Sequence, residues 1–166
     1  MSEQPASLTW ARRALAAVVG LGAVTTVLMV LLRDDLVRSW AEGRRDIRRI
    51  LETQGLDAVK EGAVHPPAFV PVAVVMFIVV AGLIWVLSAF LSGGYNWARV
   101  CLTLLLFFLA VGTIAGLRTG APPVFAALSV ASFPLEAVAV WFLWHRDTGA
   151  YLRSGAAERR EDLARS

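Results

Sequence analysis

The sequence predicts an all-α membrane protein, a four-transmembrane-helix antiparallel bundle with an amphipathic helical loop between spans one and two. Hydrophobic residues make up 57% of the 166 residues and charged residues only 17%, against roughly 45–50% and about 25% in soluble domains. The apolar residues lie in four long blocks without Lys, Arg or Asp. As a helix, about 20 such residues cross a hydrocarbon core ~30 Å thick, and the blocks are too long for strands.

The first block, residues 14–32, ends sharply at Arg33-Asp34-Asp35. Because Arg12 and Arg13 precede it, the alternative interpretation is a signal peptide. Its apolar run of 19 residues exceeds the usual ~7–15 of such peptides, and no small-x-small cleavage site follows it. We therefore interpret the block as an uncleaved span.

The long connection after the first span contains a candidate amphipathic helix, within about residues 34–62. Its apolar residues fall on one face at 100° per residue, with Gly43 interrupting the stripe: Leu36, Trp40, Ile47, Ile50 and Leu51. Three interpretations stay open. The helix packs on the mouth of the bundle, lies on the lipid surface, or docks a partner protein.

The other three spans are predicted at residues 69–91, 100–117 and 123–144, followed by a polar C-terminal tail at 146–166. The last part of this tail, SGAAERREDLARS, is predicted to be a short, solvated helix. The connections SGGYNWA and RTGAPP are short enough to force antiparallel hairpins. Pro122 and Pro123 open the last span, where proline at a first helical position costs least.

An even number of spans places both termini on one side. Lys and Arg totals are equal on the two sides, but the terminal side has more arginines close to span ends, namely Arg12, Arg13, Arg99, Arg146 and Arg153, against Arg33, Arg38 and Arg118. Five aromatic residues also mark the terminal side as interface anchors: Trp10, Tyr95, Trp97, Trp141 and Trp144. The positive-inside rule then predicts that both termini are cytoplasmic.

Glu136 in the last span is the one acidic residue inside any block. A charge near the bilayer midplane costs at least about 2.5–3.5 kcal/mol. Because no span offers Lys or Arg as a counter-ion, we expect the carboxyl group to be protonated. The functional interpretation is a proton, cation or ligand site. The structural interpretation is a neutral acid that hydrogen-bonds Ser, Thr or a carbonyl freed by Pro134.

Small residues four apart suggest close helix packing. Gly112 and Gly116 form a GxxxG in the third span, and Ala16 and Gly20 repeat the spacing in the first. We expect them to serve packing within the monomer, and the alternative is a homodimer face.

The chain lacks the residues that several membrane-protein activities need. His65 and His145 flank the spans and so cannot hold a haem between them, and a single cysteine, Cys101, excludes an intramolecular disulfide or a Cys-x-x-Cys pair. No Glu-x-x-His, HExxH or phosphate-binding glycine loop occurs. We expect no metal, no cofactor and no enzymatic activity. The basic residues are dispersed around the spans, which favours lipid phosphates over nucleic acid as partner.

Two stretches carry a family resemblance. Gly94-Tyr95-Asn96-Trp97-Ala98-Arg99 and the closing segment WFLWHRDTGAYLR resemble patterns of small four-span integral membrane proteins of actinobacteria. The resemblance covers roughly spans two to four and implies location and fold.

Arginine is used almost to the exclusion of lysine, since Lys60 is the one lysine in the chain. This bias suggests a bacterial genome of high GC content.

These observations favour a non-enzymatic protein of the bacterial inner membrane, an accessory or interaction subunit whose partners are the bilayer and another membrane protein or a second copy of itself. The alternative function is a small proton-coupled carrier in which Glu136 titrates.

Overall fold

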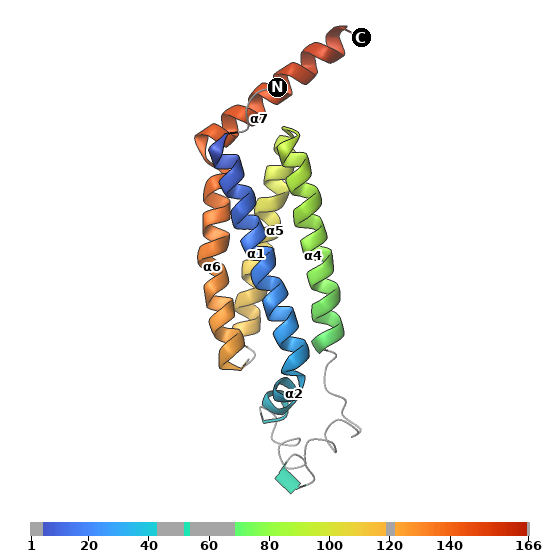
Figure 1. Ribbon diagram of the computed structural model, residues 1–166, viewed down its shortest axis with the longest axis vertical. Coiled ribbons are helices and arrows are strands. Elements are labelled where there is room, and N and C mark those ends of the chain that lie inside the picture. Colours follow the sequence, from blue (N-terminus) through green and yellow to red (C-terminus); the bar gives the residue numbers. More distant parts are fainter. Residues whose placement is uncertain (1–4, 43–51, 54–68, 119–121, 166) are drawn as a thin grey trace.

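The protein is a bundle of four helices with a further helix at each end (Figure 1). The computed structural model describes residues 5–42, 52–53, 69–118 and 122–165. In these ranges the named helices are α1 (Ala6–Leu31), α2 (Arg33–Glu42), α4 (Phe69–Ser92), α5 (Asn96–Leu117), α6 (Pro123–Leu143) and α7 (Arg146–Arg165). No strand occurs in the described part of the chain.

Four of these helices are long and apolar enough to cross a membrane, which confirms the predicted all-α four-span bundle. Two of them extend beyond the predicted blocks. α1 begins at Ala6 rather than at residue 14, and α5 begins at Asn96 rather than at residue 100. At about 1.5 Å per residue, the 26 residues of α1 exceed the hydrocarbon core, so its first turns carry Arg12 and Arg13 beyond it.

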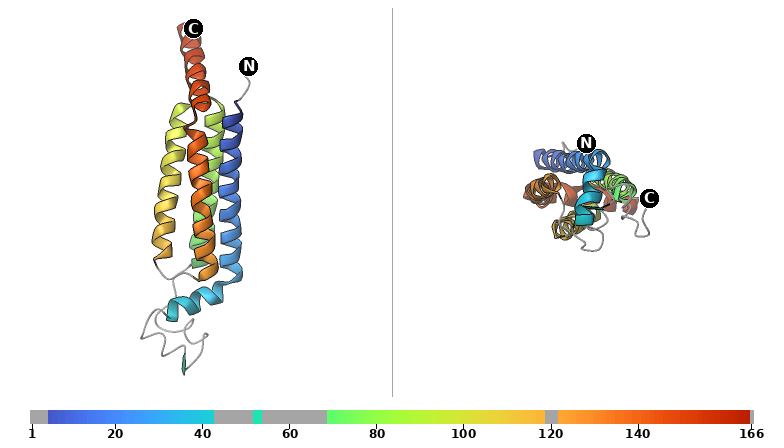
Figure 2. Two further views of the ribbon diagram at one scale, coloured as in Figure 1. Left: turned by 90° about the vertical axis from the view of Figure 1, so that its left-hand side faces the viewer. Right: turned by 90° about the horizontal axis from the view of Figure 1, so that it is seen from below.

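The four spans form a ring in which α1 lies between α6 and α4, and α5 closes the ring between α4 and α6 (Figure 2). Both termini lie at one end of the bundle, where α1 begins and α6 ends (Figure 1). We call this the terminal end and the opposite end, with α2, the loop end. The shared end agrees with an even number of spans.

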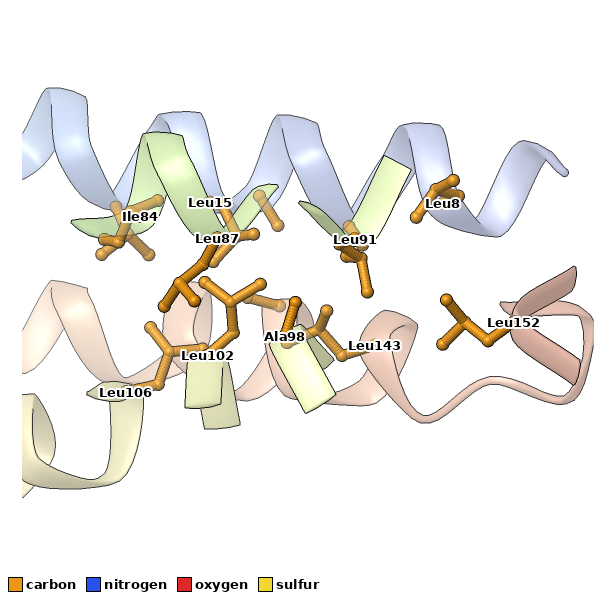
Figure 3. Packing of buried hydrophobic residues seen from close by; sticks show 14 residues of the cluster. Leu8, Leu15, Ile84, Leu87, Leu91, Ala98, Leu102, Leu106, Leu143 and Leu152 are labelled. Carbon is orange, nitrogen blue, oxygen red and sulfur yellow. The ribbon is translucent and has the colours of Figure 1, made fainter. Parts of the chain in front are cut away.

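The apolar core occupies the terminal half of the bundle (Figure 3). Its members come from the first turns of α1 and α5, the last turns of α4 and α6, and the start of α7, and include Leu8, Leu15, Leu91, Leu102, Leu143 and Leu152. In the loop half, the buried apolar residues among those described are Leu36 and Phe125. The helices are therefore packed tightly at one end and loosely at the other.

The outer surface of the bundle is apolar. Large hydrophobic side chains are exposed along all four spans, for example Val27, Ile78, Phe108 and Val130. A soluble protein seldom exposes a continuous apolar surface of this extent, whereas hydrocarbon solvates it. The exposed face is therefore the face that lies against lipid.

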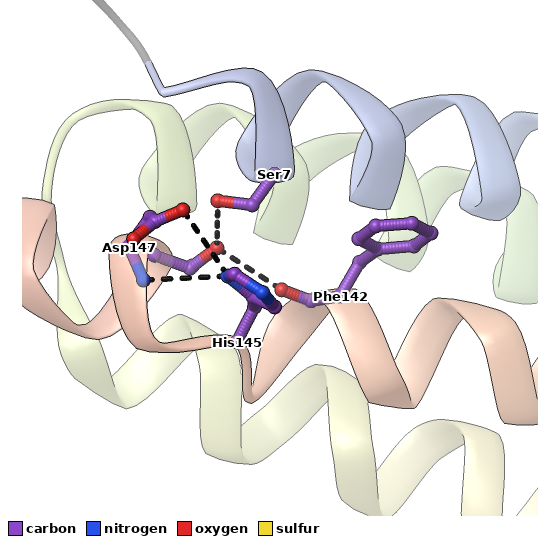
Figure 4. Close-up of polar contacts among 5 residues, drawn as sticks. Ser7, Phe142, His145 and Asp147 are labelled. Carbon is purple, nitrogen blue, oxygen red and sulfur yellow. Dashed lines mark hydrogen bonds and ion pairs between the residues drawn. The ribbon is translucent and has the colours of Figure 1, made fainter.

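Helix α7 is docked onto the terminal end through its first turns (Figure 4). The fully buried Thr148 hydroxyl donates to the Phe142 carbonyl at 3.0 Å and accepts from Ser7 at 2.9 Å. Further along, the Tyr151 hydroxyl donates to the Ser92 carbonyl at 2.8 Å, and Leu152 joins the core. A solvated helix was predicted only from Ser154 on; the helix already begins at Arg146, and its first turns pack against the bundle.

At the loop end, α2 crosses beneath the bundle (Figure 2). It contains the first part of the predicted amphipathic helix, and Leu36 on it is buried. Gly43, Ile47, Ile50 and Leu51 of that prediction lie outside the described residues.

Candidate functional site

Glu136 lies inside the bundle, three residues past the middle of α6 toward the terminal end. Only 7% of the residue is exposed, and its Oε2 atom has no hydrogen-bond partner. The neighbouring hydroxyl is that of Ser132, one turn earlier in α6. Because Ser132 donates its own proton to the Ser129 carbonyl at 2.8 Å, it can only accept from Glu136. A hydrogen bond between the two side chains therefore needs the protonated carboxyl group.

A central cavity of about 360 Å³ extends from Glu136 into the loop half of the bundle. All four spans line it, through apolar side chains such as Met76, Phe77 and Leu128 and through five hydroxyl groups, those of Thr25, Thr26, Thr113, Ser129 and Ser132. The Thr25 and Thr26 hydroxyls donate to carbonyls of their own helix at 2.9 Å, which leaves their oxygen atoms free to accept a further hydrogen bond.

The lining of this cavity contains one carboxyl group and no Lys, Arg or His. If Glu136 loses its proton, no neighbouring positive charge in the lining compensates it. An unpaired carboxylate in a site of low dielectric is strongly disfavoured. The site therefore accepts either a proton on Glu136 or a cationic group beside it.

A second hollow, about 850 Å³ in volume, lies between α5 and α6 on the lipid-facing side. Its walls are mostly apolar, with Leu106, Phe107 and Phe133 among them, and its end near α7 is lined by Trp144, His145 and Arg146. We call it the outer groove. Glu136 lines the outer groove as well as the central cavity, so α6 forms the wall between the two at this residue.

The five predicted interface aromatics lie at the terminal end, and 38% to 71% of each is exposed. Two of them contact an arginine. The Arg99 guanidinium lies 4.0 Å from the ring centre of Trp144, whose indole nitrogen donates to Thr103 at 3.0 Å. Arg13 lies 5.1 Å from the ring centre of Trp10. Such cation–π contacts hold guanidinium groups at the depth of the aromatic belt.

The small residues predicted to pack within the monomer do not do so. Gly20, Gly112 and Gly116 are exposed, and an added Cβ at any of them would meet no atom within 4 Å. Ala16 is exposed too. These faces point away from the other described helices, which corrects the expectation of packing within the monomer. The homodimer face stays a prediction.

The described residues contain no group of three or more His, Cys, Asp or Glu that could hold a metal ion. His145 lies against the Asp147 carboxylate at 3.3 Å outside the spans. Cys101 is a free, half-buried thiol packed against the core. His65 lies outside the described residues.

Sequence reasoning missed three residues that organise the terminal end. Arg99 was placed before the third span but lies in the first turn of α5, and Thr148 and Tyr151 were assigned no contact with the bundle. A signal for the last two was present, because Thr148, Leu152 and Gly155 share one helical face, and this is the face that docks.

Comparison with known proteins gives no family assignment. The chain matches no family model, no curated protein and no solved structure. The resemblance to actinobacterial four-span proteins therefore stays a prediction, and the geometry of the cavity is what bears on function.

Proposed function

We propose that this chain is a non-enzymatic carrier of the bacterial inner membrane that binds a small organic cation in the central cavity and exchanges it for a proton on Glu136. The observation that carries the proposal is the Glu136 carboxyl group, which lines the cavity with one oxygen atom unpartnered and no basic residue in the lining. Proton and cation compete for the same carboxylate, so binding of one releases the other.

The uneven packing of the bundle supports this proposal. The terminal half is filled by the core, whereas the cavity occupies the loop half. A carrier that alternates its access needs one closed half and one open half at a time. The cavity volume of about 360 Å³ lies at the lower end of the roughly 300–1,000 Å³ of small-molecule sites, and its apolar lining with a few polar groups is typical of them.

The test uses purified protein with radiolabelled methyltriphenylphosphonium as the probe cation. We expect saturable binding in detergent and uptake into proteoliposomes driven by a pH gradient. Glu136→Gln keeps the shape but cannot titrate, and should abolish both. Asp35→Asn, which removes an exposed carboxylate of α2, is the matched control and should behave like the wild type. Equal uptake by the wild type and Glu136→Gln would falsify the proposal.

The second candidate function is an accessory subunit of a membrane complex. It is favoured by α7, whose last turns project beyond the bundle at the terminal end (Figure 1). A chain truncated after Gly155 keeps the docked turns and loses this projection. If a larger complex co-purifies with the full chain and with Glu136→Gln, but not with the truncated chain, the subunit function is supported instead.

A further inference from the structure

Three arginines gather around the start of α7. A Cβ atom added to Gly149 would lie 3.5 Å from a terminal nitrogen of Arg99 and 3.6 Å from one of Arg153. The two guanidinium groups, one from α5 and one from α7, therefore approach the same point. Arg146 precedes Arg153 by seven residues on α7, which is two helical turns, so these two arginines share one helix face.

No ion pair joins these arginines to any acidic side chain whose placement the structure describes. The nearest carboxylate along the chain, that of Asp147, pairs with His145. The Nε atom of Arg99 is buried without a hydrogen-bond partner. Like charges held this close repel each other, so an anion placed between Arg99 and Arg153 is stabilised by both.

The outer groove leads away from these arginines toward the bilayer interior. Arg146 lines the end of the groove. Trp144 lines it too, and the Arg99 guanidinium stacks on the Trp144 ring. The remaining wall is mostly apolar, apart from Thr103 and Glu136, and Phe107 and Trp141 in it are largely exposed. One continuous surface thus joins a cationic end, at the depth of the aromatic belt, to an apolar channel in the hydrocarbon.

We propose that the outer groove binds one anionic phospholipid, whose phosphate lies among Arg99, Arg146 and Arg153 and one of whose acyl chains follows α5 and α6. Guanidinium groups bind phosphate oxygens in paired hydrogen bonds, which accounts for the cationic end. A soluble phosphate ion would leave most of the groove, about 850 Å³ in volume, unfilled, whereas a lipid fills both its cationic end and its mostly apolar part. The lipid site and the cation site lie on the two sides of α6 and share one lining residue, Glu136.

The experiment compares lipids on the delipidated full chain by native mass spectrometry in mild detergent. We expect phosphatidylglycerol to bind at least about tenfold more tightly than phosphatidylcholine, at one saturable site. Arg146→Gln, Arg99→Gln and Arg153→Gln should each weaken phosphatidylglycerol binding by roughly fivefold. The matched control is Arg33→Gln with Arg118→Gln, two exposed arginines at the loop end, which should leave the preference intact.

A second variant separates the groove from the charges. Ala110→Trp fills the groove and leaves the three arginines in place, so it should lose phosphatidylglycerol. Arg146 is exposed, and Arg146→Gln alone therefore decides the matter if Arg99→Gln fails to fold. The proposal is overturned if both lipids bind equally, if the loop-end control loses the preference too, or if inorganic phosphate displaces phosphatidylglycerol at comparable concentration.

Discussion

Single buried hydrogen bonds hold the terminal end together, and Thr148 is the clearest case. Its hydroxyl links α6, α7 and α1 and is fully buried. Thr148→Val keeps the shape and leaves the Phe142 carbonyl and the Ser7 hydroxyl without this partner. We expect a loss of about 1–3 kcal/mol in the free energy of unfolding, measured by denaturant titration in detergent with tryptophan fluorescence as the signal.

The matched control for Thr148 is Ser154, an exposed residue of the same helix whose hydroxyl bonds only the nearby Tyr151 carbonyl. Ser154→Ala should stay within about 0.5 kcal/mol of the wild type. If the two variants lose equal stability, burial is not what makes the Thr148 hydroxyl matter.

At the same scale, sequence reasoning identified Glu136 but could not place its surroundings. A carboxyl group in an apolar block is visible in any sequence, because its burial is costly wherever it lies. Its neighbours depend on how α6 is rotated, and a helix that is apolar all round has no marked face from which to infer that rotation. For the same reason Gly112 and Gly116 were assigned to the bundle interior although both lie on the outside.

At the scale of the helices, the two faces of α5 should differ sharply in their response to mutation. Leu102 is fully buried in the core, whereas Leu104, two residues on, is 51% exposed to lipid. Leu102→Ala opens a cavity and should cost about 2–5 kcal/mol of unfolding free energy. Leu104→Ala, the control, exchanges only lipid contacts and should cost about 0.5 kcal/mol or less. The same denaturant titration measures both, and similar losses would contradict the assigned rotation of α5.

The docking of α7 depends on a close backbone approach. A Cβ added to Gly155 would lie 3.6 Å from the Gly94 Cα atom, so there is room for a methyl group and little more. Gly155→Leu should push the helix away and weaken its docking by about 1–3 kcal/mol. Hydrogen exchange of the α7 amides measures the loss as faster exchange, and Ala157→Leu, at an exposed position two residues on, should leave the rates unchanged.

The existence of the helices was predictable from the sequence, but two of their starts were not. A count of apolar residues finds the part of a helix that lipid surrounds, but it does not find the residue at which helical hydrogen bonding begins. The predicted spans therefore omitted the polar first turns of α1, from Ala6, and of α5, from Asn96. The docking of α7 was missed because it depends on contacts with α1 and the α4–α5 turn, far away in the sequence.

At the scale of the whole molecule, the ring of four spans follows from hydropathy and from short connections, whereas the cavity does not. The cavity exists because the core fills the terminal half alone, and no pattern in an all-apolar block records how far apart two helices lie. The two ends of the molecule differ, so its orientation in the membrane matters. The fold alone does not determine which end faces the cytoplasm.

The distribution of arginines predicts that orientation. Those at the terminal end lie close to the spans, so the positive-inside rule places that end in the cytoplasm. In a Cys101→Ser background, Asp35→Cys at the loop end should react with a membrane-impermeant maleimide in intact cells, and Ser154→Cys on α7 only after the cells are opened. Both residues are exposed, so access depends on the membrane alone. The opposite labelling pattern would reverse the orientation and place the three arginines in the outer leaflet, while their geometry relative to the groove would stay the same.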